Sequence, residues 1–296
     1  MDIRQLRYVL AVARRLSFTV AAGDLSIAQP ALSQQIAGLE RELGVRLFDR
    51  TNRRVSLTDA GRALVVRAER ILADVSAAAE EMSAFAGGLR GRVVLGTYQS
   101  FSEYTLPKLL GRFHALYPGI EIALREGLAD DLLAQLHAGS IDAFIGDPGD
   151  AGHSLARAFV SEPLYEDELV IALAATHPRA RASVIEIGEL RDEPWVIFRP
   201  GSSLTARVYA LARASGFVPR IAFESVDSMT VRSLVAEGLG VALFPRTLGN
   251  TPGPNVALVS LAPNRVFRRM SLVTRQGPYA PSASTFLGFI RERLHE

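Results

Sequence analysis

The stretch that decides the N-terminal fold begins at Ser17 and ends at Leu57, and it reads SFTVAAGDLSIAQPALSQQIAGLERELGVRLFDRTNRRVSL. A short apolar pattern at helical spacing is followed by a turn, a second helical pattern, and two apolar runs around an arginine-rich segment. Ser17 is a good N-cap for the first helix, and Pro30 fits the first turn of the second because its missing N–H has no partner there. This order predicts a winged helix-turn-helix, with the helix-turn-helix at about 18–37 and the wing at about 47–57.

The second of these helices has an apolar face and a polar face. Its expected inner stripe is Leu32, Ile36, Leu39 and Leu43. Its expected outer residues, which are candidates for contact with base edges, are Gln29, Pro30, Ser33 and Gln34. Glutamine can pair with adenine through two hydrogen bonds, serine can donate or accept, and a small apolar surface can touch a thymine methyl group. Gly23 and Ser26 are expected to allow the turn that precedes this helix.

Positive charge is concentrated in the same part of the chain. Residues 1–60 contain nine arginines and six acidic residues, a net charge of +3, whereas the whole chain is only +2. Arg50, Arg53 and Arg54 on the predicted wing suit phosphate contact or insertion into the minor groove. Taken singly, a polar helix face or an arginine-rich turn is as easily ordinary solvent-exposed surface. Together they favour a segment that binds double-stranded DNA.

A long helix is predicted directly after the wing, over residues 59–88. Thr58 is a good N-cap, and Gly87-Gly88 ends the pattern. Apolar residues recur three and four positions apart, at Leu64, Ala68, Ile71, Val75, Ala78, Met82 and Phe85. Such a narrow stripe after a DNA-binding segment indicates a dimerisation helix. The alternative is that the helix packs against the next domain of its own chain.

The chain resembles the LysR-type transcriptional regulators over essentially its whole length. The residues that carry the resemblance are Ser17-Phe18-Thr19 with Ala21-Ala22, Gln29-Pro30-Ala31-Leu32-Ser33, Leu43-Gly44, Leu47-Phe48-Asp49-Arg50 and Leu57-Thr58-Asp59-Ala60-Gly61. The resemblance implies base and phosphate contacts at Gln29, Pro30, Ser33, Gln34, Arg50 and Arg53, although many relatives have arginine where this chain has Gln34. It also implies a dimer or tetramer on promoter DNA that bends the DNA and, when an effector binds, favours recruitment of RNA polymerase.

The remaining two thirds alternate between strand and helix patterns and predict an α/β domain with a parallel sheet. The resemblance implies a two-lobed effector-binding domain over 89–296, similar to a periplasmic binding protein. Lobe one would comprise about 92–160 and 267–296, and lobe two about 161–266. With residues 1–58 as the DNA-binding domain and 59–88 as the linker helix, the expected architecture is α/β behind a helical head.

An effector is expected beyond the carboxyl ends of strands, where helix N-termini offer N–H groups to anions. The candidate residues at such places are Gln99, Ser100, Gly127, Arg199, Gly201 and Ser202. Arg199 would favour a carboxylate-bearing effector, or it makes an internal salt bridge. Ser100 and Ser202 could instead cap helices, which is the commoner role of serine at such positions.

Other chemistry has little support in the sequence. Cysteine is absent, which excludes disulfides, thiol catalysis and the cysteine-based peroxide sensing of some relatives. The histidines are scattered, no catalytic or phosphate-binding motif occurs, and the acidic groups Asp130-Asp131 and Glu166-Asp167-Glu168 are expected to be solvated. We therefore expect no enzyme activity, no metal, no cofactor beyond the effector, no membrane segment and a cytoplasmic protein. The alternative is a small-molecule binding protein or corepressor whose DNA-binding part does not function.

Overall fold

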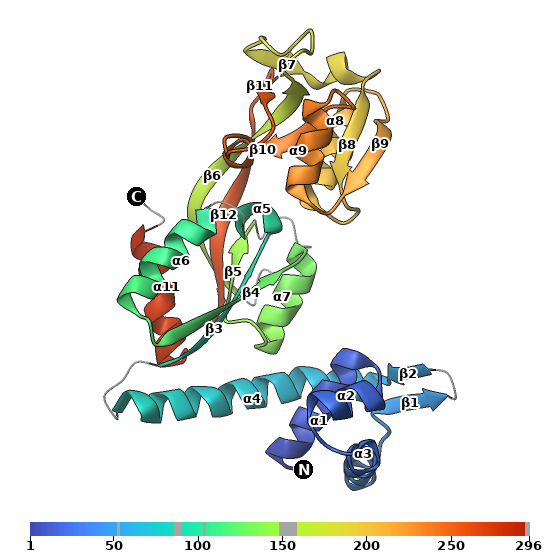
Figure 1. Cartoon of the computed structure of the whole chain (residues 1–296), viewed down its shortest axis with the longest axis vertical. Coiled ribbons are helices and arrows are strands. Elements are labelled where there is room, and N and C mark those ends of the chain that lie inside the picture. Colours follow the sequence, from blue (N-terminus) through green and yellow to red (C-terminus); the bar gives the residue numbers. More distant parts are fainter. Residues whose placement is uncertain (52–53, 86–89, 103–104, 148–158, 294–296) are drawn as a thin grey trace.

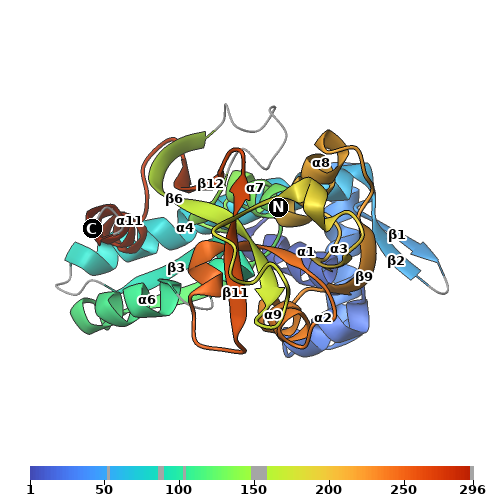
Figure 2. The ribbon, with the colours of Figure 1, turned by 90° about the horizontal axis from the view of Figure 1, so that it is seen from above.

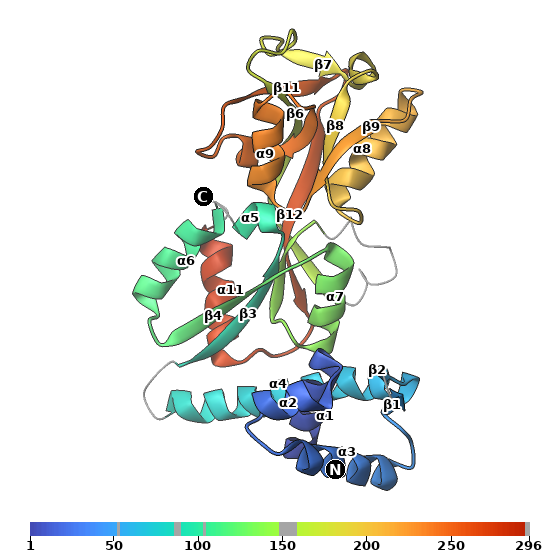
Figure 3. The same ribbon diagram turned by 45° about the vertical axis from the view of Figure 1, so that its right-hand side comes forward.

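The chain folds into a helical head, one long helix and a two-lobed α/β domain (Figure 1). The computed structural model describes residues 1–51, 54–85, 90–102, 105–147 and 159–293. The long helix runs beneath the α/β domain, and lobe one lies between this helix and lobe two (Figure 3). In a view from above, the wing lies at one end of the long helix, and helices of lobe one lie over its other end (Figure 2).

The head contains the predicted helix-turn-helix and wing. Its elements are α1 (Ile3–Arg15), α2 (Phe18–Asp24), α3 (Gln29–Leu43), β1 (Phe48–Thr51) and β2 (Arg54–Leu57). Asp2 forms a capping box with Gln5 at the start of α1, and the Ser17 hydroxyl accepts a hydrogen bond from the Val20 N–H at 3.3 Å. Gly44 ends α3 with a φ of 70°. The Ser17 cap and the position of Pro30 in the first turn of α3 confirm the expectations from the sequence.

Two expectations about the head are wrong. Gly23 lies inside α2, so the turn is made instead by Ser26, whose φ of 54° places it in the left-handed region. Leu43 is 38% exposed, because the last turn of α3 extends beyond the core that buries Leu32, Ile36 and Leu39. The core is otherwise continuous and apolar, and the ring of Phe18 packs edge-on against that of Phe48.

The long helix α4 (Asp59–Phe85) begins as predicted, because the Thr58 hydroxyl accepts from the Gly61 N–H at 2.9 Å. The predicted apolar stripe divides into two halves. Ala68 and its neighbours pack on α1 of the same chain, where they cover Leu6 and Leu10. Farther along, Val75 is 42% exposed and Met82 is 61% exposed. Only this second half is therefore available to a second copy of the chain. The side chain of Phe85 lies outside the described residues.

Lobe one is a three-layer sandwich. Its strands β3 (Gly91–Thr97), β4 (Ile120–Glu126) and β5 (Ala143–Gly146) are parallel, in the order β4-β3-β5. Its helices are α5 (Gln99–Ser102), α6 (Thr105–Leu116), α7 (Ala129–Ala138) and α11 (Pro281–Arg293). The helices α6 and α11 pack on one face of the sheet and α7 packs on the other, which buries an apolar cluster on each side.

Two long strands connect the lobes. They are β6 (Phe159–Ala174) and β12 (Val266–Arg275), and they pair antiparallel along nearly their whole length with a register shift between Met270 and Ser271. The strand β12 also pairs antiparallel with β5. The α/β class is confirmed, but the sheet is mixed rather than wholly parallel, because these connecting strands run against those of lobe one.

Lobe two surrounds the other ends of β6 and β12. Its elements are β7 (Val184–Glu186), the 3-10 helix η3 (Ile187–Leu190), β8 (Pro194–Phe198), α8 (Ser203–Ala214), β9 (Arg220–Ser225), α9 (Ser228–Ala236), β10 (Ala242–Pro245), α10 (Arg246–Gly249) and β11 (Val256–Ala262). Its core centres on Trp195, the single tryptophan of the chain, which is fully buried. Among the described helices of the whole chain, we find none that combines the length and the apolarity needed to cross a membrane.

Candidate functional site

The exposed face of α3 carries the predicted base-contacting residues. Gln29, Pro30 and Gln34 are exposed and Ser33 is half-buried, while the opposite face of the helix is fixed in the head core. This arrangement presents polar side chains from a rigid helix, which is the geometry needed to read base edges in a major groove.

The wing is a two-stranded hairpin in which Phe48 faces Leu57 and Arg50 faces Val55. It is tied to α3 by Glu40, whose carboxylate accepts from the N–H groups of Leu47 and Phe48 at 2.8 and 3.1 Å. Sequence reasoning missed this role of Glu40. Arg53 and the side chains of Arg50 and Arg54 lie outside the described residues.

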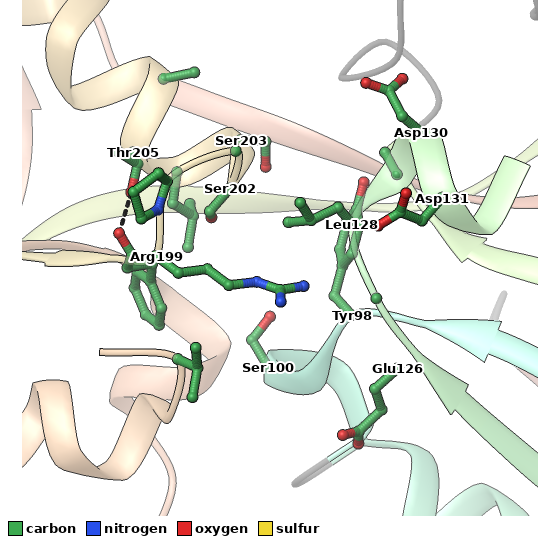
Figure 4. A pocket seen from close by; sticks show the side chains of 18 of the residues that line it. Tyr98, Ser100, Glu126, Leu128, Asp130, Asp131, Arg199, Ser202, Ser203 and Thr205 are labelled. Atoms are coloured by element: carbon green, nitrogen blue, oxygen red, sulfur yellow. Dashed lines mark hydrogen bonds between the residues drawn. The ribbon is translucent and has the colours of Figure 1, made fainter. Parts of the chain in front are cut away.

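A second candidate site is a cavity of about 750 Å³ between the two lobes (Figure 4). Five of the six predicted effector-binding residues line it, namely Ser100, Gly127, Arg199, Gly201 and Ser202. Gln99 is the first residue of α5, beside Ser100, but it is not among the lining residues, and its side chain is not described. Most of the predicted residues, from positions far apart in the chain, thus meet at this cavity, although they are a minority of its lining.

Lobe two contributes the N-terminus of α8 and the residues before it. The side chain of Arg199 extends from this side toward Ser100, and its guanidinium group makes no hydrogen bond or ion pair with the described residues, whereas its carbonyl oxygen accepts from the Ser202 N–H at 3.1 Å. Ser202 occupies the N-cap position of α8, yet its side chain makes no capping hydrogen bond. Gly201 has a φ of 85°, and a Cβ there would lie 2.9 Å from Leu128 of lobe one. The two lobes thus approach closely at the edge of the cavity.

Lobe one contributes the N-terminus of α7 to the opposite side. Gly127 and Leu128 precede this helix, and Asp130 and Asp131 lie in its first turn. Both aspartates are exposed, and neither makes a hydrogen bond or ion pair within the described part of the chain. Both are solvent-exposed, as expected, and they also line the lobe-one side of the cavity, opposite the side from which Arg199 extends.

Beneath these groups lies Arg268 of β12, which sequence reasoning missed. Its side chain is 3% exposed and donates to the Asp167 carboxylate from Nε and Nη2 at 3.2 and 2.9 Å. Its Nη1 donates to the Ser100 hydroxyl at 3.3 Å. Ser100 therefore has a side-chain partner in the connecting strands and is not simply a helix cap. The available signal was that the residues two positions away on the same strand face, Val266 and Met270, are apolar.

The acidic run 166–168 on β6 is also not solvated as expected. Asp167 accepts a hydrogen bond from the Thr247 hydroxyl at 2.6 Å in addition to those from Arg268. Glu168 accepts from Arg246 at 2.7 Å. Burial on its own would raise the pKa of Glu168, but hydrogen bonds from Arg246 and Ser260 and the charges of Arg246 and Arg265 together outweigh it, so that this pKa lies below its ordinary value. Only Glu166 of the three is exposed.

Two family models match the chain in the two regions just described. Residues 3–62 match the model described as "Bacterial regulatory helix-turn-helix protein, lysR family", and residues 86–295 match the one described as "LysR substrate binding domain". The chain belongs to the LysR family. Its head is the family's helix-turn-helix, and its two lobes are the family's ligand-binding domain.

Similar proteins support this assignment over most of the chain. The regulator BudR of Raoultella terrigena is 36% identical over 260 residues, which are 86% of this chain and 88% of BudR. The dual regulator OxyR of Escherichia coli K12 is 32% identical over 245 residues, covering 83% and 79% of the two chains. The solved structure of full-length CbnR with its target DNA matches with a TM-score of 0.70 at 25% identity, over 99% of both chains.

The protein is thus a LysR-type DNA-binding transcriptional regulator with an effector-binding domain. The family consists of transcriptional regulators rather than enzymes. Its members bind promoter DNA and form oligomers. A binding protein or corepressor with a non-functional head, the alternative considered from the sequence, is not favoured by these matches.

Proposed function

We propose that this LysR regulator reads promoter DNA as a dimer or tetramer in the cytoplasm, and that a small molecule bound between its lobes changes that binding and the recruitment of RNA polymerase. The DNA contacts would come from Gln29, Pro30, Ser33 and Gln34 of α3. The wing arginines Arg50, Arg53 and Arg54 would hold the adjacent phosphates or minor groove. In this proposal the oligomer bends its DNA, and the effector relaxes the bend.

A direct test is a footprint of the full-length protein on the DNA upstream of its own gene at near-physiological salt. Discrete protection of a dyad-symmetric site supports the proposal. Gln34→Ala should abolish this protection, whereas Gln35→Ala, an equally exposed glutamine on the flank of the same helix, should retain it. Diffuse coating that disappears with added salt would contradict sequence-specific reading by α3.

The observation that supports effector control is the position of α7. Its N-terminal residues line the cavity, and its C-terminal residue pair His137-Ala138 lies beside α4. Arg70 of α4 donates to the His137 carbonyl oxygen from Nε at 2.8 Å and from Nη2 at 2.5 Å. A ligand that displaces the first turn of α7 would therefore act, through one rigid helix, on the helix that carries the DNA-binding heads.

Arg70→Ala tests this route. The variant should bind an effector as the parent protein does but lose the change in DNA affinity that the effector causes, which in coupled systems is about 5- to 150-fold. The matched control is Arg67→Ala, an exposed arginine one turn earlier in α4. Unchanged coupling in Arg70→Ala would show that the signal does not pass through this contact.

The effector is expected to be small and to carry a carboxylate group, which is supported by the cavity residues Ser100, Gly127, Arg199, Gly201 and Ser202. Arg199 can pair with a carboxylate through two hydrogen bonds, and the free N–H groups at the start of α8 favour negative charge at the same place. Arg199→Gln should then weaken binding of a carboxylate-bearing effector in a calorimetric titration by about 10- to 100-fold.

A further inference from the structure

The charges that line the cavity are not those of a site for a simple anion. Among its described lining residues are three carboxylates, on Glu126, Asp130 and Asp131, and two guanidinium groups, on Arg199 and Arg268. Arg268 is already bound to the buried carboxylate of Asp167. Arg199 is thus the one cation of this lining that is not neutralised by a described protein group, and more than one carboxylate lines the same cavity.

The two signs of charge are separated in space. Arg199 and the N-terminus of α8 lie on the lobe-two side of the cavity, and Asp130 and Asp131 lie on the lobe-one side (Figure 4). The aspartates stabilise the start of α7, which explains why they occur in a first turn. It does not explain why both residues line a cavity whose other side carries an arginine with which neither is paired.

A plain carboxylate would satisfy only half of this site. Its negative charge would pair with Arg199 but would also enter a cavity that two aspartates line, and like charges repel. A cationic amine alone would pair with the aspartates and leave Arg199 unpaired. A molecule that carries both groups satisfies both sides, and it links lobe one to lobe two through its own two charges.

We infer that the effector is a small zwitterion, an amine-bearing carboxylate of the size of an amino acid. Its carboxylate binds Arg199 and the N–H groups at the start of α8, and its ammonium group binds Asp130 and Asp131 at the start of α7. This inference rests on the proposed effector function of the cavity and adds the chemical class of the ligand. Ser100 and Ser202 also line the cavity, on the side near Arg199, and their hydroxyl groups can orient the carboxylate of the ligand.

The test is calorimetric titration of the full-length protein with the twenty L-amino acids. Each amino acid that binds is compared with the carboxylic acid that lacks its amino group and with the amine that lacks its carboxylate. We expect at least one amino acid to bind about 10- to 100-fold more tightly than either analogue. Binding should be measured alongside the effect of the same compounds on DNA affinity.

Two variants assign the two charges. The double variant Asp130→Asn, Asp131→Asn should bind the amino acid about tenfold or more weakly than the parent protein does, but its affinity for the amine-free analogue should not fall. Arg199→Gln should lower the affinity for the amino acid but not the affinity for the carboxylate-free analogue. Asp192→Asn is the matched control, because Asp192 is exposed in lobe two and does not line the cavity. Trp195 fluorescence confirms that each variant is folded, since this side chain is buried in the lobe-two core.

The possible outcomes are distinct. If no amino acid binds, or if the amine-free analogue binds equally well and the aspartate variant leaves it unchanged, the zwitterion inference is wrong. If a plain carboxylate binds through Arg199 and alters DNA affinity, the proposed control by an effector is supported and only the inferred ligand class is wrong. If an amino acid binds through both charged sides without altering DNA affinity, the ligand class stands and the proposed regulation falls.

Discussion

The head and the inter-lobe cavity are built in opposite ways. The head is one contiguous segment whose interior is apolar and whose candidate functional side chains lie on its surface. The cavity is assembled from several distant segments above a buried ionic network, in which Arg268 and Asp167 are 101 residues apart in the sequence. A local, apolar core can bear changes to its functional surface without loss of stability. In the cavity, function and stability depend on some of the same side chains.

The largest expected effect of a single substitution is therefore beneath the cavity. Arg268→Ala leaves the carboxylate of Asp167, which is 1% exposed, without its main charged partner. Breaking a buried ion pair in this way costs about 3–5 kcal/mol. Urea unfolding followed by Trp195 fluorescence should show this loss in the effector-binding domain, while hydrogen exchange of α3 in the head should stay as it is in the parent protein.

Arg269→Ala is the control for this substitution. Its side chain lies on the opposite face of β12 and pairs with Glu166 at 3.6 Å, with both groups well exposed. Such surface pairs contribute about 0–1 kcal/mol. Equal losses for Arg268→Ala and Arg269→Ala would show that the buried network does not support the domain.

The second prediction concerns the core of the head. Ile36→Ala removes a fully buried side chain from the face of α3 that packs on α1 and α2, and such truncations cost about 2–5 kcal/mol. DNA binding and hydrogen-exchange protection of α3 should be lost together, with no change in the urea midpoint reported by Trp195. Gln34→Ala should separate these two losses, because an exposed substitution changes stability by about 0.5 kcal/mol or less.

The same contrast explains what could be predicted from the sequence. The head was predictable because its signals are local, as in the Ser17 cap, Pro30 in the first turn of α3 and the spacing of Leu32, Ile36 and Leu39. The cavity candidates came from strand ends and from the family resemblance. Arg268 and Asp167 were missed because nothing in either local sequence indicates a partner about a hundred residues away. The predicted burial of Leu43 was wrong because the periodicity of apolar residues does not show where the core ends.

The third prediction concerns the attachment of the wing. Glu40→Ala removes the acceptor for the N–H groups of Leu47 and Phe48, two buried residues. An unsatisfied buried donor costs about 1–3 kcal/mol, so head stability and DNA affinity should both fall. Glu40→Gln retains a carbonyl acceptor and should recover part of the loss. Glu42→Ala, which truncates an exposed glutamate of the same helix, should leave both quantities nearly unchanged.

The smallest effects are those of pH, and they differ in sign between two carboxylates of the effector-binding domain. The pKa of Glu168 lies below its ordinary value, because its hydrogen bonds and the charges of nearby arginines together outweigh burial. Its contribution to stability is therefore present above the unfolded-state pKa and is lost as the pH falls through the lowered folded-state pKa. Burial raises the pKa of Asp142 despite a hydrogen bond from the Val94 N–H at 2.7 Å. Its charge is therefore a cost at neutral pH, which is relieved as the pH falls through the raised folded-state value.

The neutral variants test these signs in one experiment. At pH 7, Glu168→Gln should lower the free energy of unfolding and Asp142→Asn should raise it or leave it unchanged. Both differences should shrink toward acid pH, that of Glu168→Gln below the ordinary pKa of glutamate and that of Asp142→Asn as the pH falls through the raised pKa of Asp142. An Asp142→Asn variant that loses stability at neutral pH would mean that the charged carboxylate, through Val94 and Arg275, stabilises the junction between β3 and β5 more than its burial costs. The ionic parts of this domain would then all be stabilising, and the contrast with the apolar head would be sharper still.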